Sequence, residues 1–301
     1  MQRKYILLVA GFLVALNVFC WKEVFDLSAP RYLLVDFLDV GQGDAVFIET
    51  PQGHQILIDG GPNSSVLAKL AELMPFWDKT IDLVILTHPE KDHMTGILDV
   101  LQKYKVSYFL WTGVIKNDAE NKKLASILDE IQTPKSNFLL AALNQSSATK
   151  VLIASAGEEI KAGDVLVDIL FPVENLEGQD LKNSANDTSI INKIVYGENS
   201  FLFTGDIGSG TEKELVSSGK DIVSDVLKVA HHGSKYSTSD LFLQTVSPKY
   251  AVIEVGKNSY GHPTPEVLQR LEKFGIKVLR TDRDGDIKFI CDGFSLFQNK
   301  K

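Results

Sequence analysis

Histidine and aspartate follow the ends of several apolar segments in the 301-residue chain. The segments are 56–58, 83–86, 201–203 and 226–230, and the residues that come after them include Asp59, His88, Asp206, His231 and His232. In α/β folds, ligand sites form where strands end in flexible backbone. A mixture of imidazole and carboxylate suits hard and borderline divalent metals. The pattern therefore predicts a metal site assembled from distant parts of the chain.

The densest group of candidate ligands is the hexapeptide His-Pro-Glu-Lys-Asp-His at 88–93. Neither helix nor strand geometry directs so many side chains to one point, so we expect a loop that leads into a helix from Met94. A helix cap with solvated charges is the simpler interpretation, because Asp is a good N-cap residue. A cap needs no distant partners, however, and Asp206 and His231 at other strand ends favour metal binding.

Two further groups of polar residues accompany these positions. The run Asp-Val-Gly-Gln-Gly-Asp at 39–44 lacks the third glycine of a dinucleotide-binding loop and precedes a strand, not a helix. We expect it to form an active-site turn with Asp39, Gln42 and Asp44 near the metals. The candidates for substrate contact are His232, Ser234, Tyr260 and His262. We also treat His262 as a candidate catalytic residue, and a structural hydrogen bond is the competing interpretation for it.

The elements that would position these residues alternate between strands and helices. Strands are expected at 32–38, 45–50, 55–58, 82–86, 165–170, 190–196, 201–203, 226–229, 251–255 and 277–279. Helices are expected at 63–74, 94–104, 118–131, 210–217, 239–246 and 265–274. Short strands mixed with helices, some paired as hairpins across glycine turns, indicate an α/β layer protein and not an all-parallel sheet.

The segment 87–96 resembles the signature of the metallo-β-lactamase superfamily, with Glu90 where the usual second histidine would stand. Asp59, Asp206 and His231 resemble other motif positions of that superfamily. The ordered series FLDVGQGDAVFIET, THPEKDHMTG, NDTSI, LFTGD, LKVAHHGSKYSTS, YGHPTPEVLQRL and TDRDGDI is similar to the exported hydrolase domain of ComEC-type competence DNA-uptake proteins, over about residues 32–290. The resemblance implies a metallo-β-lactamase-like αββα sandwich.

The resemblance also implies two divalent metal ions. The expected ligands are His88 with Glu90 or Asp187 for one ion, Asp92, His93 and His231 for the other, and Asp206 as the bridge. Asp187 stands roughly where the superfamily often has a third histidine, and an aspartate with a turn role is the alternative. Asp59 is expected to orient a histidine ligand through a hydrogen bond.

The expected chemistry is hydrolysis of a phosphodiester, with DNA as the substrate. Two metal ions activate a water and neutralise charge on phosphate oxygens. Asp92 is the expected group to orient that water and to carry its proton as a catalytic residue. Glutamate at position 90 makes one site harder, which favours Mn²⁺ or Mg²⁺, and Zn²⁺ is also compatible.

Charge neither demands nor forbids a nucleic-acid substrate. The net charge is −8, so the chain as a whole does not attract DNA. Residues 228–288 nevertheless contain ten Lys or Arg against seven Asp or Glu, and two divalent ions would add local positive charge. The two cysteines, Cys20 and Cys291, allow neither a disulfide framework nor a Cys-x-x-Cys metal site.

The N-terminus predicts a membrane anchor. Tyr5 to Trp21 contains no charged residue, and Arg3 and Lys4 precede it, which favours a cytoplasmic N-terminus and an extracytoplasmic remainder. A cleaved signal peptide is the alternative, but no convincing small-x-small site follows the apolar run. We therefore expect a single-pass cell-membrane protein with an anchor at 1–22, a linker at 23–31 and a hydrolase domain at 32–301.

Three hypotheses for function remain open from the sequence. The first is a DNA nuclease related to competence, which would need a separate DNA-translocation pore protein because one anchor replaces the multispanning part of ComEC-type proteins. The second is hydrolysis of another substrate by the same fold, such as a lactam, a lactone or a choline-phosphate ester. The third is a non-catalytic interaction module. No sequence feature indicates an oligomeric state.

Overall fold

The structure is a computed structural model that describes residues 2–28, 32–132, 148–179 and 185–299. The chain divides into two compact units, residues 1–31 and 32–301. The first contains one helix, α1 (Gln2–Ser28), whose segment Lys4–Lys22 is long and apolar enough to cross a membrane and is not buried by other parts of the protein. The helix extends to Ser28, so most of the stretch predicted as a linker is helical, and 29–31 lie outside the described residues.

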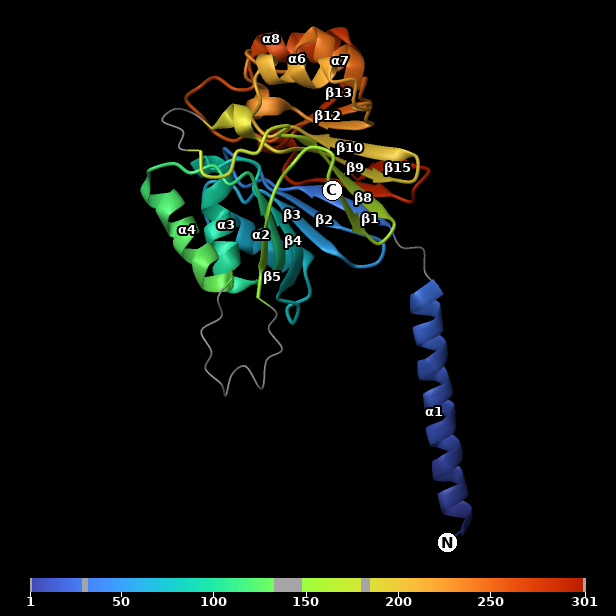
Figure 1. Ribbon diagram of the computed structural model, residues 1–301. Helices are drawn as coiled ribbons and strands as arrows, with labels where there is room; N and C mark the ends of the chain where they lie inside the picture. Colours follow the sequence, from blue (N-terminus) through green and yellow to red (C-terminus); the bar gives the residue numbers. More distant parts are fainter. Residues whose placement is uncertain (1, 29–31, 133–147, 180–184, 300–301) are drawn as a thin grey trace. The chain divides into compact units, whose positions relative to one another are not determined.

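Two mixed sheets form the centre of the second unit (Figure 1). The first has the order β15-β14-β1-β2-β3-β4-β5-β6. Its strands are β1 (Leu33–Phe37), β2 (Val46–Glu49), β3 (Gln55–Ile58), β4 (Thr80–Ile85), β5 (Lys105–Trp111), β6 (Lys150–Ile153), β14 (Ile287–Cys291) and β15 (Leu296–Asn299). Strands β3 to β6 run parallel, and β1, β2 and β14 are antiparallel to their neighbours.

The second sheet has the order β13-β12-β11-β10-β9-β8-β7. Its strands are β7 (Glu159–Ala162), β8 (Val165–Phe171), β9 (Ile191–Tyr196), β10 (Asn199–Phe203), β11 (Val226–Lys228), β12 (Tyr250–Ile253) and β13 (Lys277–Arg280). Strands β10 to β13 are parallel. Both sheets therefore have a parallel half, whose carboxyl ends can carry a site.

Alternation along the strands divides the core into three layers. In β1, for example, Leu33, Val35 and Phe37 belong to the cluster between the two sheets. The outer face of the first sheet packs against α2 (Ser65–Leu73), α3 (Lys91–Lys103) and α4 (Ala119–Gln132). The outer face of the second packs against α6 (Ser209–Ser217), α7 (Asp240–Val246) and α8 (Pro265–Lys273), and a short α9 (Thr281–Asp284) follows β13. The result is the predicted αββα sandwich (Figure 1).

Most predicted elements are present, and five strands were missed. Strands β5, β6, β7, β14 and β15 were not predicted from the sequence. They include exposed or half-buried positions, and in β6, at the sheet edge, exposed and half-buried residues alternate. Strands β7, β14 and β15 contain charged or polar residues, which weaken the sequence signal. Strands β5 and β6 do contain apolar runs, at 108–111 and 151–153, and sequence reasoning overlooked them. Helix α3 also starts earlier than expected, at Lys91, so Asp92 and His93 lie in its first turn.

Candidate metal centre

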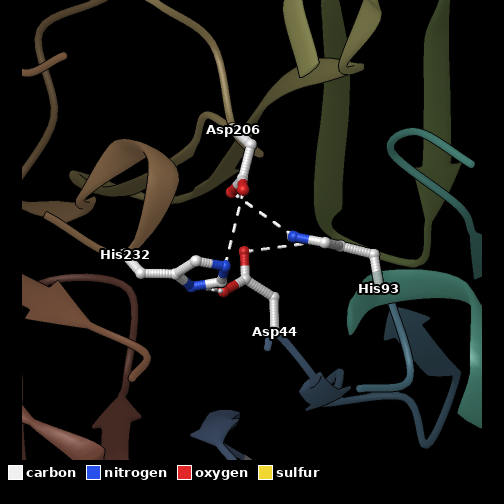
Figure 2. A group of neighbouring side chains, drawn as sticks. All are labelled: Asp44, His93, Asp206 and His232. Atoms are coloured by element: carbon white, nitrogen blue, oxygen red, sulfur yellow. Dashed lines mark ion pairs between the residues drawn. The ribbon is translucent and has the colours of Figure 1, made fainter. Parts of the chain in front are cut away.

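Four side chains from distant parts of the chain converge at the carboxyl ends of the parallel strands. Asp44, His93, Asp206 and His232 each offer a ligand atom, and these atoms all lie within 4.8 Å of one another. Asp44 precedes β2, His93 lies in the first turn of α3, Asp206 follows β10, and His232 lies in the 3₁₀ turn η2 (Ala230–Gly233) after β11. Figure 2 shows the four side chains pointing toward a common centre, and all four are buried.

Asp206 is the member that joins the two histidines. His93 Nε2 lies 3.4 Å from Asp206 Oδ1, and His232 Nε2 lies 3.4 Å from Asp206 Oδ2. On the other side, His232 Nδ1 lies 3.2 Å from Asp44 Oδ1 and donates to the Glu254 carbonyl at 2.8 Å. The spacing of these nitrogen and oxygen atoms is close to that of ligands around one metal ion.

Glycines allow the backbone to approach closely around this cluster. A Cβ at Gly43 (φ +148°) would lie 2.1 Å from the Asp92 carbonyl oxygen, and the Asp44 N–H donates to that same oxygen at 3.2 Å. The glycine-rich turn is thus packed directly on the start of α3. His231 and His232 both adopt left-handed backbone conformations, with φ of 51° and 52°. Such conformations in residues other than glycine concentrate at functional sites.

Buried partners orient two of the histidines. Asp59 Oδ2 accepts a hydrogen bond from His93 Nδ1 at 2.8 Å, which leaves Nε2 facing the cluster. Asp59 also accepts from the N–H of Thr87 at 2.8 Å and from its hydroxyl at 2.7 Å. His88 Nδ1 lies 3.0 Å from Thr87 Oγ1 and 3.2 Å from Ser189 Oγ. The hydrogen bond that the sequence predicted from Asp59 to a histidine is therefore present, to His93.

The buried charges of the cluster stabilise one another. Burial disfavours the charged form of His93, but the carboxylates of Asp206, Asp44 and Asp59 outweigh it and raise its pKa well above the ordinary value. Burial likewise opposes ionisation of His232, and Asp206 and Asp44 raise its pKa to about 10. For Asp206, burial is outweighed by His232, His93 and Lys228, which hold its pKa well below the usual range.

His88 differs electrostatically from the other buried histidines. Burial, reinforced by the neighbouring His93, lowers the pKa of His88 well below its ordinary value. Its ring centroid lies 4.2 Å from that of His93, and its Nε2 is buried without a hydrogen-bond partner in the part of the chain that the structure describes. A neutral imidazole with a free nitrogen is the form that binds a metal.

A polar cleft opens above the cluster. Its volume is about 470 Å³, and it is lined by Gln42, Glu90, Asp92, Lys116, Asn186, Asp206, His231, His232, Tyr260 and His262. Asp92 is the member that links the cleft to the cluster, because its Oδ2 lies 3.3 Å from His232 Nε2 and its side chain is 35% exposed. Tyr260 is exposed at the rim, and the His262 ring lies 5.6 Å from that of His231.

The structure places the two adjacent histidines differently from the expectation. The sequence assigned His231 to the metal and His232 to the substrate. In the structure His232 is 2% exposed and belongs to the cluster, whereas His231 lines the cleft with its Nε2 3.9 Å from Asp206 Oδ2. Both residues follow the same strand, and the left-handed backbone at this turn decides which side chain points inward.

Asp187 and Glu90 are corrections to the expected ligand set. Asp187 Oδ1 accepts from the Gly208 N–H at 2.8 Å and from the Thr211 hydroxyl at 3.1 Å, so this carboxylate caps the start of α6 and is not a member of the cluster. Glu90 lines the cleft, but its Oε1 pairs with Lys116 Nζ at 2.7 Å and accepts from the Ala185 N–H at 2.8 Å. A carboxylate oxygen used in this way is not directed at the cluster.

Two of the residues expected near the metal or the substrate have structural roles instead. Asp39 Oδ1 accepts from the Gly41 N–H at 3.3 Å within the glycine-rich turn. Ser234 is 2% exposed, and its hydroxyl accepts from the Tyr236 N–H at 3.4 Å. Neither lines the cleft. Gln42, Tyr260 and His262 do line it, and Asp44, expected only near the metals, is a member of the cluster itself.

Sequence reasoning did not place Lys228, Glu254 or Asn186 within the site, although Lys228 is one of the basic residues counted near the proposed ligands. The Lys228 ammonium contacts the carboxylate of Asp44 and lies 3.4 Å from Asp206 Oδ1, and these charges raise its pKa although burial opposes it. Glu254 Oε1 accepts from the Ala45 N–H at 2.9 Å, and burial and Asp44 raise its pKa well above the ordinary value. Lys228 ends β11 and Glu254 follows β12, but the strands predicted at 226–229 and 251–255 include both residues, so the strand-end rule did not single them out.

The residues present fit a divalent metal ion. Two imidazoles and two carboxylates are a donor set that borderline divalent ions accept. The unpartnered Nε2 of buried His88 points to a further ligand in the same place. Charge agrees as well, because a divalent ion could replace the protons of His93 and His232 without changing the net charge of the cluster. The structure thus supports divalent metal binding by Asp44, His93, Asp206 and His232.

The chain belongs to the metallo-β-lactamase superfamily, whose family model matches residues 38–256. ComE operon protein 3 of Bacillus subtilis (strain 168) is 35% identical over 275 residues, which cover 85% of this chain and 32% of that protein. Competence protein ComA of Neisseria gonorrhoeae is 29% identical over 253 residues, which cover 83% of this chain and 31% of that protein. The chain thus spans about a third of the length of these relatives.

A solved structure agrees at the level of fold. The metallo-β-lactamase-fold protein YhfI from Bacillus subtilis aligns with a TM-score of 0.55 and 14% identity, covering 86% of this chain and 100% of that chain. At this identity the likeness concerns the fold alone. The predicted fold class and the predicted resemblance to ComEC-type proteins are both confirmed.

Proposed function

We propose that this protein is a membrane-anchored, metal-dependent phosphodiesterase that cuts DNA outside the cytoplasm. The observation that carries the proposal is the convergence of Asp44, His93, Asp206 and His232 beneath an open polar cleft. Such a buried group of imidazoles and carboxylates has a large electrostatic cost unless it serves a site. Superfamily membership supports hydrolysis as the class of reaction.

The proposed cofactor is a pair of divalent ions, Mn²⁺ or Zn²⁺, with Mg²⁺ also compatible. Asp44, His93, Asp206 and His232 would hold one ion. The second would share Asp206 and use His88, Asp92 and His231. Such ions act as Lewis acids toward water and phosphate. Glu90 is not directed at the cluster and therefore does not influence the choice of metal. The proposed ligands are histidine nitrogens and aspartate oxygens, and this mixture is compatible with all three metals.

Residues at the cleft would bind and orient the substrate. Burial of Asp92 is outweighed by its hydrogen bond to His232 and by the charge of His93, so its pKa lies well below the usual range and it is a carboxylate at neutral pH. We assign Asp92 to orient the attacking water by accepting its hydrogen bond. Burial lowers the pKa of His231 and of His262, so both are neutral. His231 is then in the form that binds a metal, and His262 can donate a hydrogen bond to phosphate oxygen. Lys116 adds positive charge at the same cleft.

Two considerations support DNA as the substrate and an extracytoplasmic site. The named relatives include a competence protein and a product of the comE operon. Arg3 and Lys4 precede the apolar segment of α1, which favours a cytoplasmic N-terminus. The chain spans about a third of the length of these relatives, and DNA translocation by a separate pore protein is a further part of the proposal.

The test is cleavage of labelled DNA by the full chain in detergent. We expect single- or double-stranded DNA to be cut when Mn²⁺ is added, and cleavage to stop when a chelator removes the metal. Asp206→Asn should lower the rate by at least roughly a hundredfold, since it removes charge from the shared ligand. Asp240→Asn, at an exposed carboxylate on α7, is the matched control and should retain the rate.

Three outcomes would contradict the proposal. A chromogenic lactam that is hydrolysed while DNA is not would favour the second hypothesis. Purified protein that binds no Mn²⁺ or Zn²⁺ even after reloading would favour the non-catalytic module. DNA cleavage that Asp206→Asn leaves unchanged would place the activity elsewhere.

A further inference from the structure

We propose that the hydrolase domain carries a second membrane contact, the aromatic turn Pro75–Asp78, which inserts Phe76 and Trp77 into the surface of a lipid bilayer. Phe76 is 81% exposed and Trp77 is 73% exposed. Their rings meet edge to face with centroids 4.8 Å apart. Two adjacent large aromatic side chains with this exposure have a considerable free-energy cost in water, and they gain from an interface that is apolar on one side and wet on the other.

The aromatic turn is held firmly and projects its side chains outward. The Asp78 N–H donates to the Pro75 carbonyl at 2.9 Å, so Phe76 and Trp77 are the two central residues of a β-turn. The Asp78 carboxylate accepts from the Thr80 N–H at 3.0 Å and from Gln55 Nε2 at 2.8 Å. These bonds attach the turn to the first residues of β3 and β4. The rings of Phe76 and Trp77 are therefore exposed because the hydrogen-bonded turn holds them in that position.

Sheet register places this turn at the end of the domain where the chain enters from α1. Gln55, which binds the turn, pairs with Glu49 of β2, and Glu49 pairs with Leu34 of β1. β1 and β3 are both antiparallel to β2, so they start at the same end of the sheet. With a strand spacing of about 4.8 Å, the start of β4 lies roughly 14 Å from that of β1.

Further exposed aromatic residues lie at the same end. Leu33 pairs with Cys291, so the turn between β14 and β15 is next to the start of β1. Phe294 in that turn is 76% exposed, and Tyr32, which precedes β1, is 39% exposed. Aromatic residues gathered at one level are typical of the interfacial zone of membrane proteins.

Covalent linkage identifies the bilayer as the occupant. Residues 23–31 join Lys22, the end of the candidate span, to Tyr32. Even fully extended, this stretch keeps the start of β1 within roughly 35 Å of the membrane. The bilayer is therefore always close to the domain. Even a weak affinity of the aromatic side chains for the bilayer would keep them inserted for much of the time. This step rests on the proposed anchor but not on the proposed nuclease activity.

Charge and orientation follow from the same geometry. Lys79, Lys103 and Lys105 are exposed at this end, and Asp78 and Asp292 lie there too, so the aromatic side chains, and not net charge, would provide the attraction. Asp59 and His88 follow the opposite ends of β3 and β4. The metal cluster would then lie on the far side of the sheet from the bilayer, with its cleft open to an extracytoplasmic substrate.

The test uses tryptophan fluorescence of the full chain in phosphatidylcholine vesicles with brominated acyl chains, which quench only nearby rings. The chain has three tryptophans, so the double substitution Trp21→Phe and Trp111→Phe isolates Trp77. We expect Trp77 emission to shift to the blue, to be quenched by brominated lipid, to be protected from aqueous iodide, and to change little between low and high salt. A second design compares wild type with Trp77→Phe, where the difference spectrum reports Trp77 without the double substitution.

Two matched variants make the outcome decisive. Trp21, retained alone, reports the proposed span. Tyr236→Trp in a chain without other tryptophans places the probe on an exposed residue in the loop that follows His231 and His232, and it should be open to iodide and not quenched by lipid. If Trp21 is quenched and Trp77 is not, the aromatic contact is wrong while the anchor stands. If neither is quenched, both are wrong. Protection of Trp77 without lipid quenching would indicate a protein partner and would overturn the lipid assignment.

Discussion

Lys228 shows how a single buried residue can stabilise a site before a metal is present. Its ammonium is 2% exposed and donates to the Gly205 carbonyl at 2.9 Å, beside the carboxylates of Asp44 and Asp206. It balances two acidic side chains that metal binding also neutralises. Lys228 and a divalent ion therefore each stabilise the folded protein by neutralising the same two carboxylates, and one can partly replace the other.

Replacement of Lys228 by Met should destabilise the metal-free protein by about 3–5 kcal/mol, because it leaves two buried carboxylates short of a counter-charge. Added Mn²⁺ or Zn²⁺ should recover part of this loss, so the metal-induced rise in the midpoint of thermal unfolding should be larger in the variant than in wild type. Differential scanning fluorimetry with and without metal measures both quantities.

Lys249→Met is the control for this comparison. Lys249 is 72% exposed and pairs with Asp225 at 2.9 Å, and exposed pairs of this kind contribute about 0–1 kcal/mol. If metal raises the midpoint of thermal unfolding equally in Lys228→Met and in wild type, the view that Lys228 and the metal neutralise the same carboxylates is wrong.

At the scale of elements, the contact between α3 and the loop after β3 sets the position of the metal ligands. A Cβ at Gly96 would lie 1.9 Å from the Gly60 carbonyl oxygen. The Gly60 N–H donates to the His93 carbonyl at 2.8 Å, and the Gly96 N–H donates to the Gly61 carbonyl at 3.0 Å. Helix α3, which carries Asp92 and His93, is therefore held directly against the loop that carries Asp59.

We expect Gly96→Ala to force this helix away from the loop and to destabilise the protein by about 1–3 kcal/mol or more. Metal affinity should fall in the same variant, because His93 moves relative to Asp59 and Asp206. Gly210→Ala in α6 is the matched control, since a Cβ there meets nothing within 4 Å, and it should leave stability unchanged or raise it by up to about 1 kcal/mol. Urea unfolding and a metal titration with a competing dye measure the two effects. Full metal affinity in Gly96→Ala would contradict this role for the helix contact.

Glu212 joins two helices on the other side of the molecule. It lies on α6, is fully buried, and accepts from the backbone N–H groups of Thr238 and, at 2.8 Å, Ser239, directly before α7. Burial raises the pKa of Glu212, although these hydrogen bonds and Arg270 oppose the shift. The folded state therefore holds this proton more tightly than the unfolded chain does.

The sign of the resulting pH dependence follows from linkage. Between the unfolded pKa, about 4.3, and the higher folded pKa, the folded state binds more protons, so its stability falls as pH rises. The proton's contribution is fully present below the unfolded pKa and is lost as pH rises through the folded value. We expect Glu212→Gln to flatten this part of the curve of unfolding free energy against pH. Glu214→Gln, at an exposed position on the same helix, should keep the wild-type slope, and identical slopes in all three proteins would contradict the assignment.

At the scale of the whole molecule, the two units are expected to be independent in stability. The buried clusters between and outside the sheets draw their residues from Leu33 onward. A chain that starts at residue 32 should therefore unfold at the same temperature as the second unit of the full chain and bind metal with the same affinity. The full chain should stay in the membrane pellet after alkaline carbonate washing, whereas the shortened chain should be released.

Peptide mapping of the membrane-bound protein separates an anchor from a cleaved signal sequence. A retained anchor leaves Met1–Trp21 on the mature protein, and a cleaved signal removes it. Recovery of the full chain in the soluble fraction would contradict the proposed span.

Much of this protein follows from the order of residue types along the chain. Apolar periodicity predicts the strands and helices that form the sandwich, and the rule that ligands follow strand ends identifies Asp59, His88 and Asp206. These inferences succeed because strand direction is a local property and because parallel strands bring their carboxyl ends to one edge. The candidate membrane span is local in the same sense, since length and apolarity suffice to predict a helix that could cross a bilayer.

Only the tertiary structure decided which neighbouring side chain enters the centre. His231 and His232 are adjacent, and the left-handed turn at φ 51° and 52° directs His232 inward. At the adjacent pair 186 and 187, Asn186 lines the cleft while Asp187 caps α6. Lys228 and Glu254 join the site through packing across the sheet. In irregular turns no period fixes the direction of a side chain, so contacts with distant backbone determine it, and residue order alone does not contain those contacts.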